Sequence, residues 1–289
     1  MILGFSEYDM QGKRLAKSLG LPYEAVRIHY FPDGESKVTL PPKLPDHVIF
    51  CRSLNQPNDK LIELILAAKT ARQLGAGHLT LVAPYLCYMR QDKAFSPGEA
   101  ISQTVIGQLL ADLFDDVITV DPHLHRTHHL IDAVPASKAL TLSATLPMRE
   151  FLQKLGDIFL LGPDEESQQW LDAIAQDCCL SYCVARKKRL SDTEVQITLP
   201  EIDLQNKRVV LIDDVISSGE TIAITGLSCF ENGASSVDVL VTHPLFATGA
   251  IERLKQAGIG QIWSTDSITH SSNCIFLADL LAEGINKLN

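Results

Sequence analysis

Two adjacent carboxylates, Asp213 and Asp214, end the apolar run "RVVLI" and could do chemistry. Shortly after them, the small and polar stretch Ser217–Thr221 leads into a segment with a helical pattern. A turn of small residues before a helix leaves backbone N–H groups pointing outward, and together with the helix dipole these groups bind phosphate. Two adjacent acids accept hydrogen bonds from the vicinal hydroxyls of a sugar. The stretch therefore indicates a site for a ribose phosphate.

The same stretch is compatible with the acidic start of an ordinary helix, in which Glu220 only favours the helix dipole. An ATP-binding P-loop is excluded, because the lysine and the spacing of GxxxxGK[ST] are missing. The complete order is four apolar residues, Asp-Asp, two apolar residues and Ser-Ser-Gly-Glu-Thr. This order is much rarer than an acidic pair alone and favours the ribose phosphate.

Basic and imidazole side chains gather at two further places. Lys187, Lys188 and Arg189 follow an apolar stretch, and such a charge run is most often a solvated face. Four histidines lie within residues 123–129, "HLHRTHH", and their spacing could supply ligands to zinc. Neither pattern defines a reaction on its own.

The elements that must position these residues alternate along the chain. Strands are predicted at 47–51, 78–86, 116–123, 157–164, 180–186, 193–199, 208–213, 236–244 and, as the last one, 261–267. Helices are predicted at 58–74, 101–114, 144–156, 167–176, 221–233, 249–258 and 275–288, the first of them entered by Asn58 or Asp59. Such alternation is typical of parallel sheets covered by helices on both faces.

A faint internal repeat divides the chain into two similar halves. The segments 74–84 and 232–244 share a helix end, Gly-Ala, a short turn, a strand and a proline. The stretch 135–147 is small, polar and flanked by proline, which predicts that the boundary between the halves lies near it. We therefore expect domains at residues 1–143 and 144–289, and the last helix can pack on the N-terminal half.

The amino-acid composition restricts the classes of partner that the chain can bind. Of its 289 residues, 46% are hydrophobic and 21% are charged, as in an ordinary globular enzyme. A net charge of −10 repels nucleic acid and anionic membranes, so an anionic ligand needs a local basic site. We find no signal peptide, no apolar run of membrane-spanning length and no paired cysteine spacing. We therefore expect a cytoplasmic protein that binds neither nucleic acid nor membranes.

Several motifs, taken in order, resemble a known family. The Asp-Asp stretch resembles the phosphoribosyl-pyrophosphate loop of type I phosphoribosyltransferases. Before it come "FPDGE" (31–35), "YMRQDKAFSPGEAIS" (88–102), "VDPHLH" (120–125), "LGPD" (161–164) and "ARKKRLSDTEV" (185–195). Together they resemble the ribose-phosphate pyrophosphokinases, or phosphoribosyl pyrophosphate synthetases, from about residue 2 onward, and the short archaeal members most closely. The resemblance implies two similar phosphoribosyltransferase-type α/β domains, each a mostly parallel sheet flanked by helices.

The resemblance also implies roles for individual residues. An arginine binds phosphate in a bidentate manner, glutamine can recognise an adenine edge or a phosphate, and Phe31 can stack on a base. Alone, residues 31–35 would be interpreted as an Asp-Gly hairpin turn. The residues implied are Phe31, Asp33, Gly34, Glu35, Arg90 and Gln91 for ATP; Arg189, Asp213, Asp214, Ser217, Ser218, Gly219, Glu220 and Thr221 for ribose 5-phosphate; Lys187 and Arg189 for catalysis; and His123 and Asp164 for Mg²⁺.

Magnesium prefers oxygen ligands and keeps most of its waters, so one histidine and one aspartate suffice when ATP supplies the rest. Asp121 is a further candidate for the metal or its outer shell. The resemblance gives no role to His125, His128 and His129, which we expect in solvent or at a subunit contact.

The sequence departs from the family pattern at three places. Arg186 replaces an acid before the catalytic lysine, and Glu220 replaces a Gly or Ala. Glu165 and Glu166 replace small residues after "PD". These two acids should repel a polyphosphate unless they turn away or join the metal shell.

The implied reaction transfers the pyrophosphoryl group of ATP to the C1 hydroxyl of ribose 5-phosphate and releases AMP. The implied assembly is a homo-oligomer in which the 31–35 loop completes the ATP site of the neighbouring subunit. Two alternatives stay open. One is an inactive homologue that regulates a true synthetase, which Glu165 and Glu166 favour. The other is a phosphoribosyltransferase, which would need only one such domain and a hood over a nitrogenous base.

Overall fold

Two compact units make up the fold of the chain. The computed structural model describes residues 1–124, 126–127, 129–175, 180–189 and 195–288. One unit is Met1–Ser143 with Leu277–Asn289, and the other is Ala144–Phe276; we call them unit 1 and unit 2. No helix among the described residues is long and apolar enough to cross a membrane.

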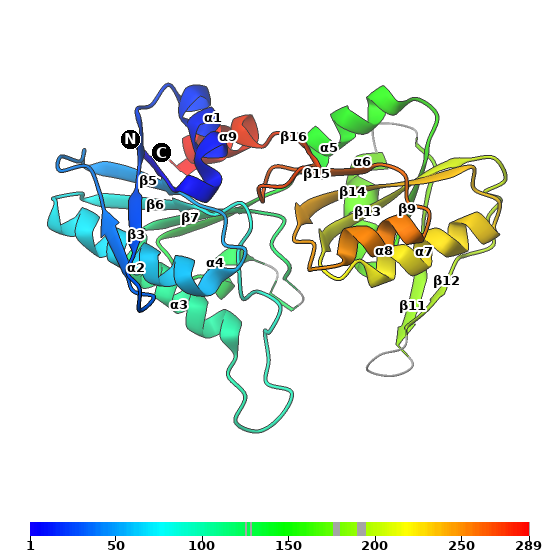
Figure 1. Ribbon diagram of the computed structural model, residues 1–289, viewed down its shortest axis with the longest axis horizontal. Coiled ribbons are helices and arrows are strands. Elements are labelled where there is room, and N and C mark those ends of the chain that lie inside the picture. The colour runs from blue at the N-terminus through cyan, green and yellow to red at the C-terminus, as the bar shows by residue number, and fades with distance from the viewer. Residues whose placement is uncertain (125, 128, 176–179, 190–194, 289) are drawn as a thin grey trace. The chain divides into compact units, whose positions relative to one another are not determined.

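Unit 1 is built on a parallel sheet with helices on both faces. Its strands are β1 (Ile2–Gly4), β2 (Tyr23–Ala25), β5 (His47–Cys51), β6 (His78–Val82), β7 (Asp116–Val120) and β8 (Lys138–Leu142). Its helices are α1 (Asp9–Leu19), α2 (Pro57–Gln73), α3 (Ser102–Leu113), α4 (Leu130–Ala133) and α9 (Ala278–Leu288). Helices α1 and α9 cover one face, and α2 and α3 cover the other (Figure 1). Burial on both faces explains why β5, β6 and β7 are continuously apolar rather than alternating.

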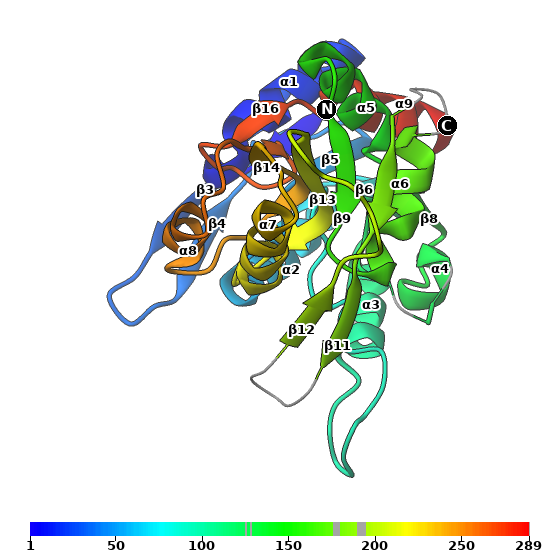
Figure 2. The same ribbon diagram turned by 90° about the vertical axis from the view of Figure 1, so that its right-hand side faces the viewer.

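Unit 2 repeats this plan. Its strands are β9 (Phe159–Gly162), β10 (Tyr182–Val184), β13 (Arg208–Ile216), β14 (Ser236–Pro244), β15 (Ile262–Thr265) and β16 (Asn273–Ile275). Its helices are α5 (Thr145–Leu152), α6 (Gln168–Ala175), α7 (Glu220–Glu231) and α8 (Ala250–Gln256). The side chains of α7 and α8 pack with those of β13 and β14 in one apolar core, and α5 and α6 lie on the other face (Figures 1 and 2).

The two sheets share one strand order. Unit 1 has the order β2-β1-β5-β6-β7-β8, unit 2 has β10-β9-β13-β14-β15-β16, and neighbouring strands run parallel throughout. Helix α2 therefore corresponds to α7, because each joins the third strand of its sheet to the fourth. The repeat noted at 74–84 and 232–244 falls on the ends of these two helices and the strands that follow. The predicted fold class of two similar α/β domains is confirmed.

Each unit also carries an antiparallel ribbon outside its sheet. In unit 1, β3 (Arg27–Tyr30) pairs with β4 (Ser36–Thr39) around residues 31–35. In unit 2, β11 (Arg186–Arg189) pairs with β12 (Val195–Thr198), and residues 190–194 between them lie outside the described residues. Both ribbons leave the carboxyl-terminal side of their sheets and carry family motifs.

Two sequence predictions, the last strand and the start of the last helix, were wrong in detail. The segment 135–147, within which the chain passes from unit 1 to unit 2, also contains the edge strand β8, which was not predicted. Its Leu142 packs against Gly284 of α9, a long-range contact that a local pattern does not reveal. Residues 261–267 do not contain the last strand, because β16 follows and takes the first residue of the helix predicted at 275–288. A strand of three residues is too short to show a period.

Two further differences concern element ends. The strand predicted at 180–186 is divided at Ala185 into β10, which joins the main sheet, and β11, which leaves it. Helix α2 begins at Pro57 rather than after Asn58 or Asp59, because proline at the first helical position needs no hydrogen-bond partner for its nitrogen.

Close packing of α3 on α4 gives a direct test of unit 1. A Cβ atom added at Gly107 of α3 would lie 1.7 Å from the carbonyl oxygen of Ala133 in α4. Because that neighbour is backbone, we expect Gly107→Ala to lower the free energy of unfolding by about 2 kcal/mol or more. Denaturant unfolding measures it. Thr104→Ala, at an exposed position of the same helix, is the control and should stay within about 0.5 kcal/mol of wild type. Equal stabilities of the two variants would contradict this packing.

Candidate active site

The predicted acidic pair lies within the central strand of unit 2. β13 continues past "RVVLI" to Ile216, so Asp213 and Asp214 are strand residues near its carboxyl end. Asp214 is only 4% exposed, and Asp213 is half-buried. The backbone N–H of Asp214 donates to Asp213 Oδ1 at 3.0 Å. Two acids are therefore held at the edge of a parallel sheet where ligands gather.

A third carboxylate faces this pair. Asp164 follows β9, which is the neighbour of β13 in the sheet, and it accepts a hydrogen bond at Oδ1 from the backbone N–H of Glu166 at 3.2 Å. Burial, together with the negative charges of Asp214 and Asp164, raises the pKa of the Asp213 carboxyl well above its ordinary value. The cluster thus has an excess of negative charge that hydroxyl donors or a cation would relieve.

The turn after β13 presents backbone donors. Gly219 has a φ of 73° and starts helix α7, so a residue with a side chain would be strained there. The Glu220 N–H donates to Ser218 Oγ at 3.4 Å. The N–H groups of Ser218, Gly219 and Thr221 donate to no described residue. Backbone N–H groups without a described acceptor therefore lie at a helix N-terminus, where a phosphate could accept from them.

Helix α8 and the turn before it fix the position of this loop. Arg253 Nη1 of α8 donates to the Ser218 carbonyl oxygen at 2.5 Å. The Ala247 N–H donates to the Ser217 carbonyl oxygen at 2.9 Å. Because the carbonyl groups are held from outside the loop, its free N–H groups keep a defined direction.

Glu165 and Glu166, the acids that replace small residues after "PD", are close to the start of β11, where Arg186 also departs from the family pattern. Glu165 and Glu166 form a 3-10 turn after Asp164, and both are exposed. Glu165 and Arg186 line the same pocket of about 320 Å³, which opens at the carboxyl ends of β9 and β10. Arg186 therefore adds a positive charge to the pocket that one of the two additional acids also lines.

The catalytic pair predicted from the basic run lies on the β11–β12 ribbon. Lys187 pairs with Ile197 and Arg189 pairs with Val195, so the two occupy alternate positions of β11. The rest of the predicted loop, residues 190–194, lies outside the described residues.

In unit 1, the residues predicted to bind ATP follow the strands at the carboxyl edge. Arg90 and Gln91 lie in the long segment between β6 and α3, which protrudes in Figure 1. The start of α3 holds Gln91, because Ser102 Oγ donates to its side-chain oxygen at 3.0 Å and the Gln103 N–H donates to its carbonyl oxygen at 3.2 Å. Arg90 is exposed, so its guanidinium is accessible to a phosphate.

The 31–35 loop closes the β3–β4 ribbon and is exposed throughout. The Phe31 N–H donates to the Glu35 carbonyl oxygen at 2.8 Å, and the Gly34 N–H donates to the Phe31 carbonyl oxygen at 2.9 Å. Gly34 has a φ of 92°, which only glycine adopts freely. The ring of Phe31, 40% exposed, meets the ring of His29 edge-on at 5.2 Å. The hairpin turn is present, and it exposes its acids and an aromatic ring.

The histidine motif follows β7. Asp121 is buried, with a φ of 37°, and its N–H donates to the Leu142 carbonyl oxygen at 2.9 Å. His123 is half-buried two residues later, and His129 is exposed. His125 and His128 lie outside the described residues, so the zinc interpretation stays a sequence-based hypothesis. Among the described residues, no three His, Cys, Asp or Glu side chains are grouped to hold a metal ion.

Comparisons with known proteins identify the family of the chain. The family model of the N-terminal domain of ribose phosphate pyrophosphokinase matches residues 1–113, and the phosphoribosyl transferase domain matches residues 147–233. The ribose-phosphate pyrophosphokinase of Methanopyrus kandleri is 32% identical, over 100% of this chain and 99% of that protein. That of Saccharolobus solfataricus is 34% identical over 97% of both chains. The chain belongs to the ribose-phosphate pyrophosphokinase family.

A solved structure supports the same fold. The crystal structure of phosphoribosylpyrophosphate synthetase from Mycobacterium smegmatis aligns with a TM-score of 0.81 and covers 100% of this chain and 98% of that one. Its sequence identity is 22%, so the likeness concerns the fold. The family resemblance predicted from the six motifs is confirmed.

Sequence reasoning missed a network of charges in unit 1. Arg52, at the end of β5, is 2% exposed, and its Nη2 donates to the fully buried Glu63 of α2. Its Nε donates to Glu7 Oε1 at 2.6 Å, and Lys60 Nζ lies 3.8 Å from the same oxygen. The available signal was an arginine directly after an apolar strand and an acid on the apolar face of the next helix.

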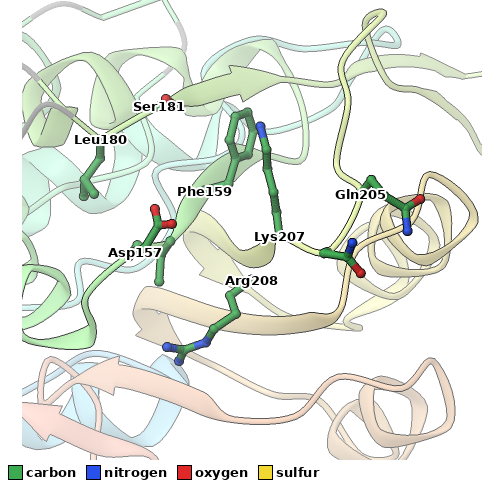
Figure 3. A pocket seen from close by; sticks show the side chains of 9 residues that line it. Asp157, Phe159, Leu180, Ser181, Gln205, Lys207 and Arg208 are labelled. Carbon is green, nitrogen blue, oxygen red and sulfur yellow. The ribbon is translucent and has the colours of Figure 1, made fainter.

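A cavity of about 600 Å³ lies away from these groups, at the amino-terminal edge of the unit 2 sheet. Figure 3 shows Lys207 reaching toward the ring of Phe159, with its Nζ 4.9 Å from the ring centroid. Arg208 Nη1 donates to the Leu155 carbonyl oxygen at 3.1 Å. Because Phe159 and Arg208 begin β9 and β13, this cavity is at the opposite edge from Asp213.

The raised pKa of Asp213 predicts that the ligand-free protein is strained at this site. A carboxyl with a higher pKa in the folded than in the unfolded protein loses stability as the pH rises through the folded pKa. We expect Asp213→Asn to raise the thermal midpoint at pH 7 by about 2 °C or more. The gain should shrink toward pH 4, because protonation of Asp213 in the wild type removes the repulsion.

Scanning calorimetry at both pH values measures the effect. Glu201→Gln removes one exposed negative charge from the same unit and should shift the midpoint by less than about 1 °C. A lower midpoint for Asp213→Asn at pH 7 would contradict the repulsion.

Proposed function

We propose that the chain transfers the pyrophosphoryl group of ATP to the C1 hydroxyl of ribose 5-phosphate, giving 5-phosphoribosyl 1-pyrophosphate and AMP for nucleotide biosynthesis. The family of the chain supports this reaction. The observation that carries it is the loop at 217–221. Its backbone N–H groups without a described acceptor closely follow the carboxylates of Asp213 and Asp214, near the carboxyl end of β13. No other described feature of the chain offers both halves of a sugar phosphate site so close together.

In this proposal the 5-phosphate binds the N–H groups of Ser218, Gly219 and Thr221 and the hydroxyls of the loop. The ribose hydroxyls donate to Asp213 and Asp214, and this fixes the direction of C1. Hydrogen-bond donors also relieve the repulsion that raises the pKa of Asp213. Positioning of this kind supplies much of the rate of a transfer between two bound substrates.

The nucleotide binds through unit 1. Arg90 meets the phosphates, Gln91 is held by α3 toward the base or a phosphate, and Phe31 stacks on the base. Asp33, Gly34 and Glu35 contact the adenine and the ribose of ATP. The exposure of the whole 31–35 loop supports this role.

Mg²⁺ is the proposed cofactor, and His123 and Asp164 would contribute to holding it together with the oxygens of ATP. The negative charge of Asp164, Asp213 and Asp214 supports a cation in this region, and a carboxylate oxygen is a ligand that magnesium prefers. The ion would neutralise charge on the phosphates. Asp164 is already oriented by the N–H of Glu166, so it presents a fixed oxygen.

Lys187 and Arg189 stabilise the transferring group, and Arg189 also contacts ribose 5-phosphate. The C1 oxygen attacks the β-phosphorus, and AMP leaves with the electrons of the broken P–O bond. The negative charge on the pyrophosphoryl oxygens is greatest at that moment, so fixed cations act most strongly there.

We propose further that the chain works in the cytoplasm as a homo-oligomer in which the 31–35 loop completes the ATP site of a neighbouring subunit. The exposed Phe31, Asp33 and Glu35 support this assembly, because they have room to meet another chain. Sedimentation at assay concentration tests it, and a fully active monomer would exclude it.

A regulatory homologue without activity is the second candidate, because Glu165 and Glu166 add charge beside Asp164. Release of AMP from ATP, measured with and without ribose 5-phosphate, separates the candidates. Release that depends on ribose 5-phosphate supports the synthetase. No release, with intact binding of both ligands, supports the regulator. Consumption of phosphoribosyl pyrophosphate with a base would instead indicate a phosphoribosyltransferase.

The basic run offers a matched pair of variants. We expect Lys187→Ala to lower kcat by about 100-fold or more, because one fixed donor to the developing charge is lost. ATP binding, measured by calorimetry, should survive. Lys188→Ala removes the same charge at the intervening position of β11, which pairs with Gln196, and should keep kcat within about threefold. Near-normal turnover of Lys187→Ala would exclude the catalytic role.

A further inference from the structure

The hairpin that carries residues 31–35 packs on the core through Ile28 and Val38, and it meets α2 close to the loop itself. Tyr30 and Ser36 form the last pair of the β3–β4 ladder before the loop begins. Ser36 Oγ donates to Glu63 Oε1 of α2 at 3.2 Å. The Glu63 carboxylate also interacts with the Tyr30 hydroxyl, and partial burial of this hydroxyl and the nearby carboxylate raise the pKa of Tyr30. Both ends of the loop therefore meet one carboxylate.

Glu63 is held firmly enough to act as a fixed support. Its side chain is fully buried, and its other oxygen accepts from Arg52 Nη2. Arg52 is itself fixed by Glu7 and by the Lys60 carbonyl oxygen, at 3.2 Å from Nη1. The guanidinium also lies 4.0 Å from the centroid of the Phe5 ring. A carboxylate that is paired with a buried arginine has little freedom to rotate.

The charged network around Arg52 lies at a position in unit 1 that corresponds to the proposed phosphate loop in unit 2. Arg52 lies in the turn between β5 and α2, and the corresponding turn between β13 and α7 holds the proposed phosphate loop. In unit 1 that turn is closed by buried charges rather than open to a ligand. The same position in the fold thus holds a buried ion pair in unit 1, and Glu63 of this pair contacts the β3–β4 hairpin at Ser36.

We propose that Glu63 is a positioning residue that sets the direction of the 31–35 loop and so determines how tightly the chain binds the nucleotide. The inference rests on the proposed function, because it takes the loop as part of the ATP site. Glu63 does not touch the nucleotide; it acts through Tyr30 and Ser36 on Phe31 and Glu35, their neighbours in sequence. The loop is exposed throughout, and its own hydrogen bonds join loop residues to one another, so they fix its shape while its direction depends on the two ends.

The test removes these two contacts and spares Glu63, because loss of Glu63 would leave the Nη2 group of the buried Arg52 without its carboxylate acceptor and destabilise the fold. In the double variant Tyr30→Phe with Ser36→Ala, we expect KM for ATP to rise about tenfold. The KM for ribose 5-phosphate and the thermal midpoint should stay near their wild-type values. Hydrogen exchange of residues 27–39 should become faster.

The matched control is the double variant Tyr23→Phe with Ser18→Ala. It removes two comparable bonds in the same unit, from Tyr23 to Asp9 at 2.7 Å and from Ser18 to Asp279 at 2.6 Å. Both are away from the hairpin loop, so KM for ATP should not change. A similar rise in KM for ATP in the control would overturn the positioning role.

An unchanged KM for ATP in the hairpin variant would also overturn it, and so would an equal rise in both KM values with a lower thermal midpoint. Failure of the positioning role can be distinguished from failure of the proposed function. If the wild type releases no AMP, the reaction assignment fails. ATP affinity by calorimetry, compared between the two double variants, then still decides whether Glu63 orients a nucleotide-binding loop.

Discussion

Three carboxylates crowd the carboxyl end of one central strand, and the account of unit 2 depends on that crowding. Asp164, Asp213 and Asp214 raise the energy of the ligand-free protein, since burial and mutual repulsion oppose ionisation of Asp213. A folded protein keeps such a cluster only where the surroundings hold it in place. Here β9, β13 and the 3-10 turn of Glu165 and Glu166 do so. The repulsion becomes useful when sugar hydroxyls or a cation bind.

The two units show how one topology gives different sites. Both have the same strand order, and in both a helix joins the third strand to the fourth. In unit 2 the turn before that helix is small and leaves N–H groups free. In unit 1 the equivalent turn begins with Arg52, whose buried side chain pairs with Glu63. Local sequence in this turn therefore decides whether it presents free N–H groups or a buried ion pair.

The sequence predicted the parts of the fold that local pattern controls. The alternation of apolar and helical segments, and the Asp-Asp loop before α7, led to the right fold class and family. Strands β8 and β16 were missed because short edge strands depend on contacts such as Leu142 with Gly284, which are distant in sequence. The pocket shared by Glu165 and Arg186, and the network around Glu63, could not be predicted because each joins separate elements.

The most direct measurement is a crystal structure with ribose 5-phosphate bound. The account predicts the phosphate within hydrogen-bonding distance of the Gly219 and Thr221 N–H groups, and the ribose hydroxyls on Asp213 and Asp214. A sugar phosphate bound elsewhere, with these amides and carboxylates left to solvent, would contradict it.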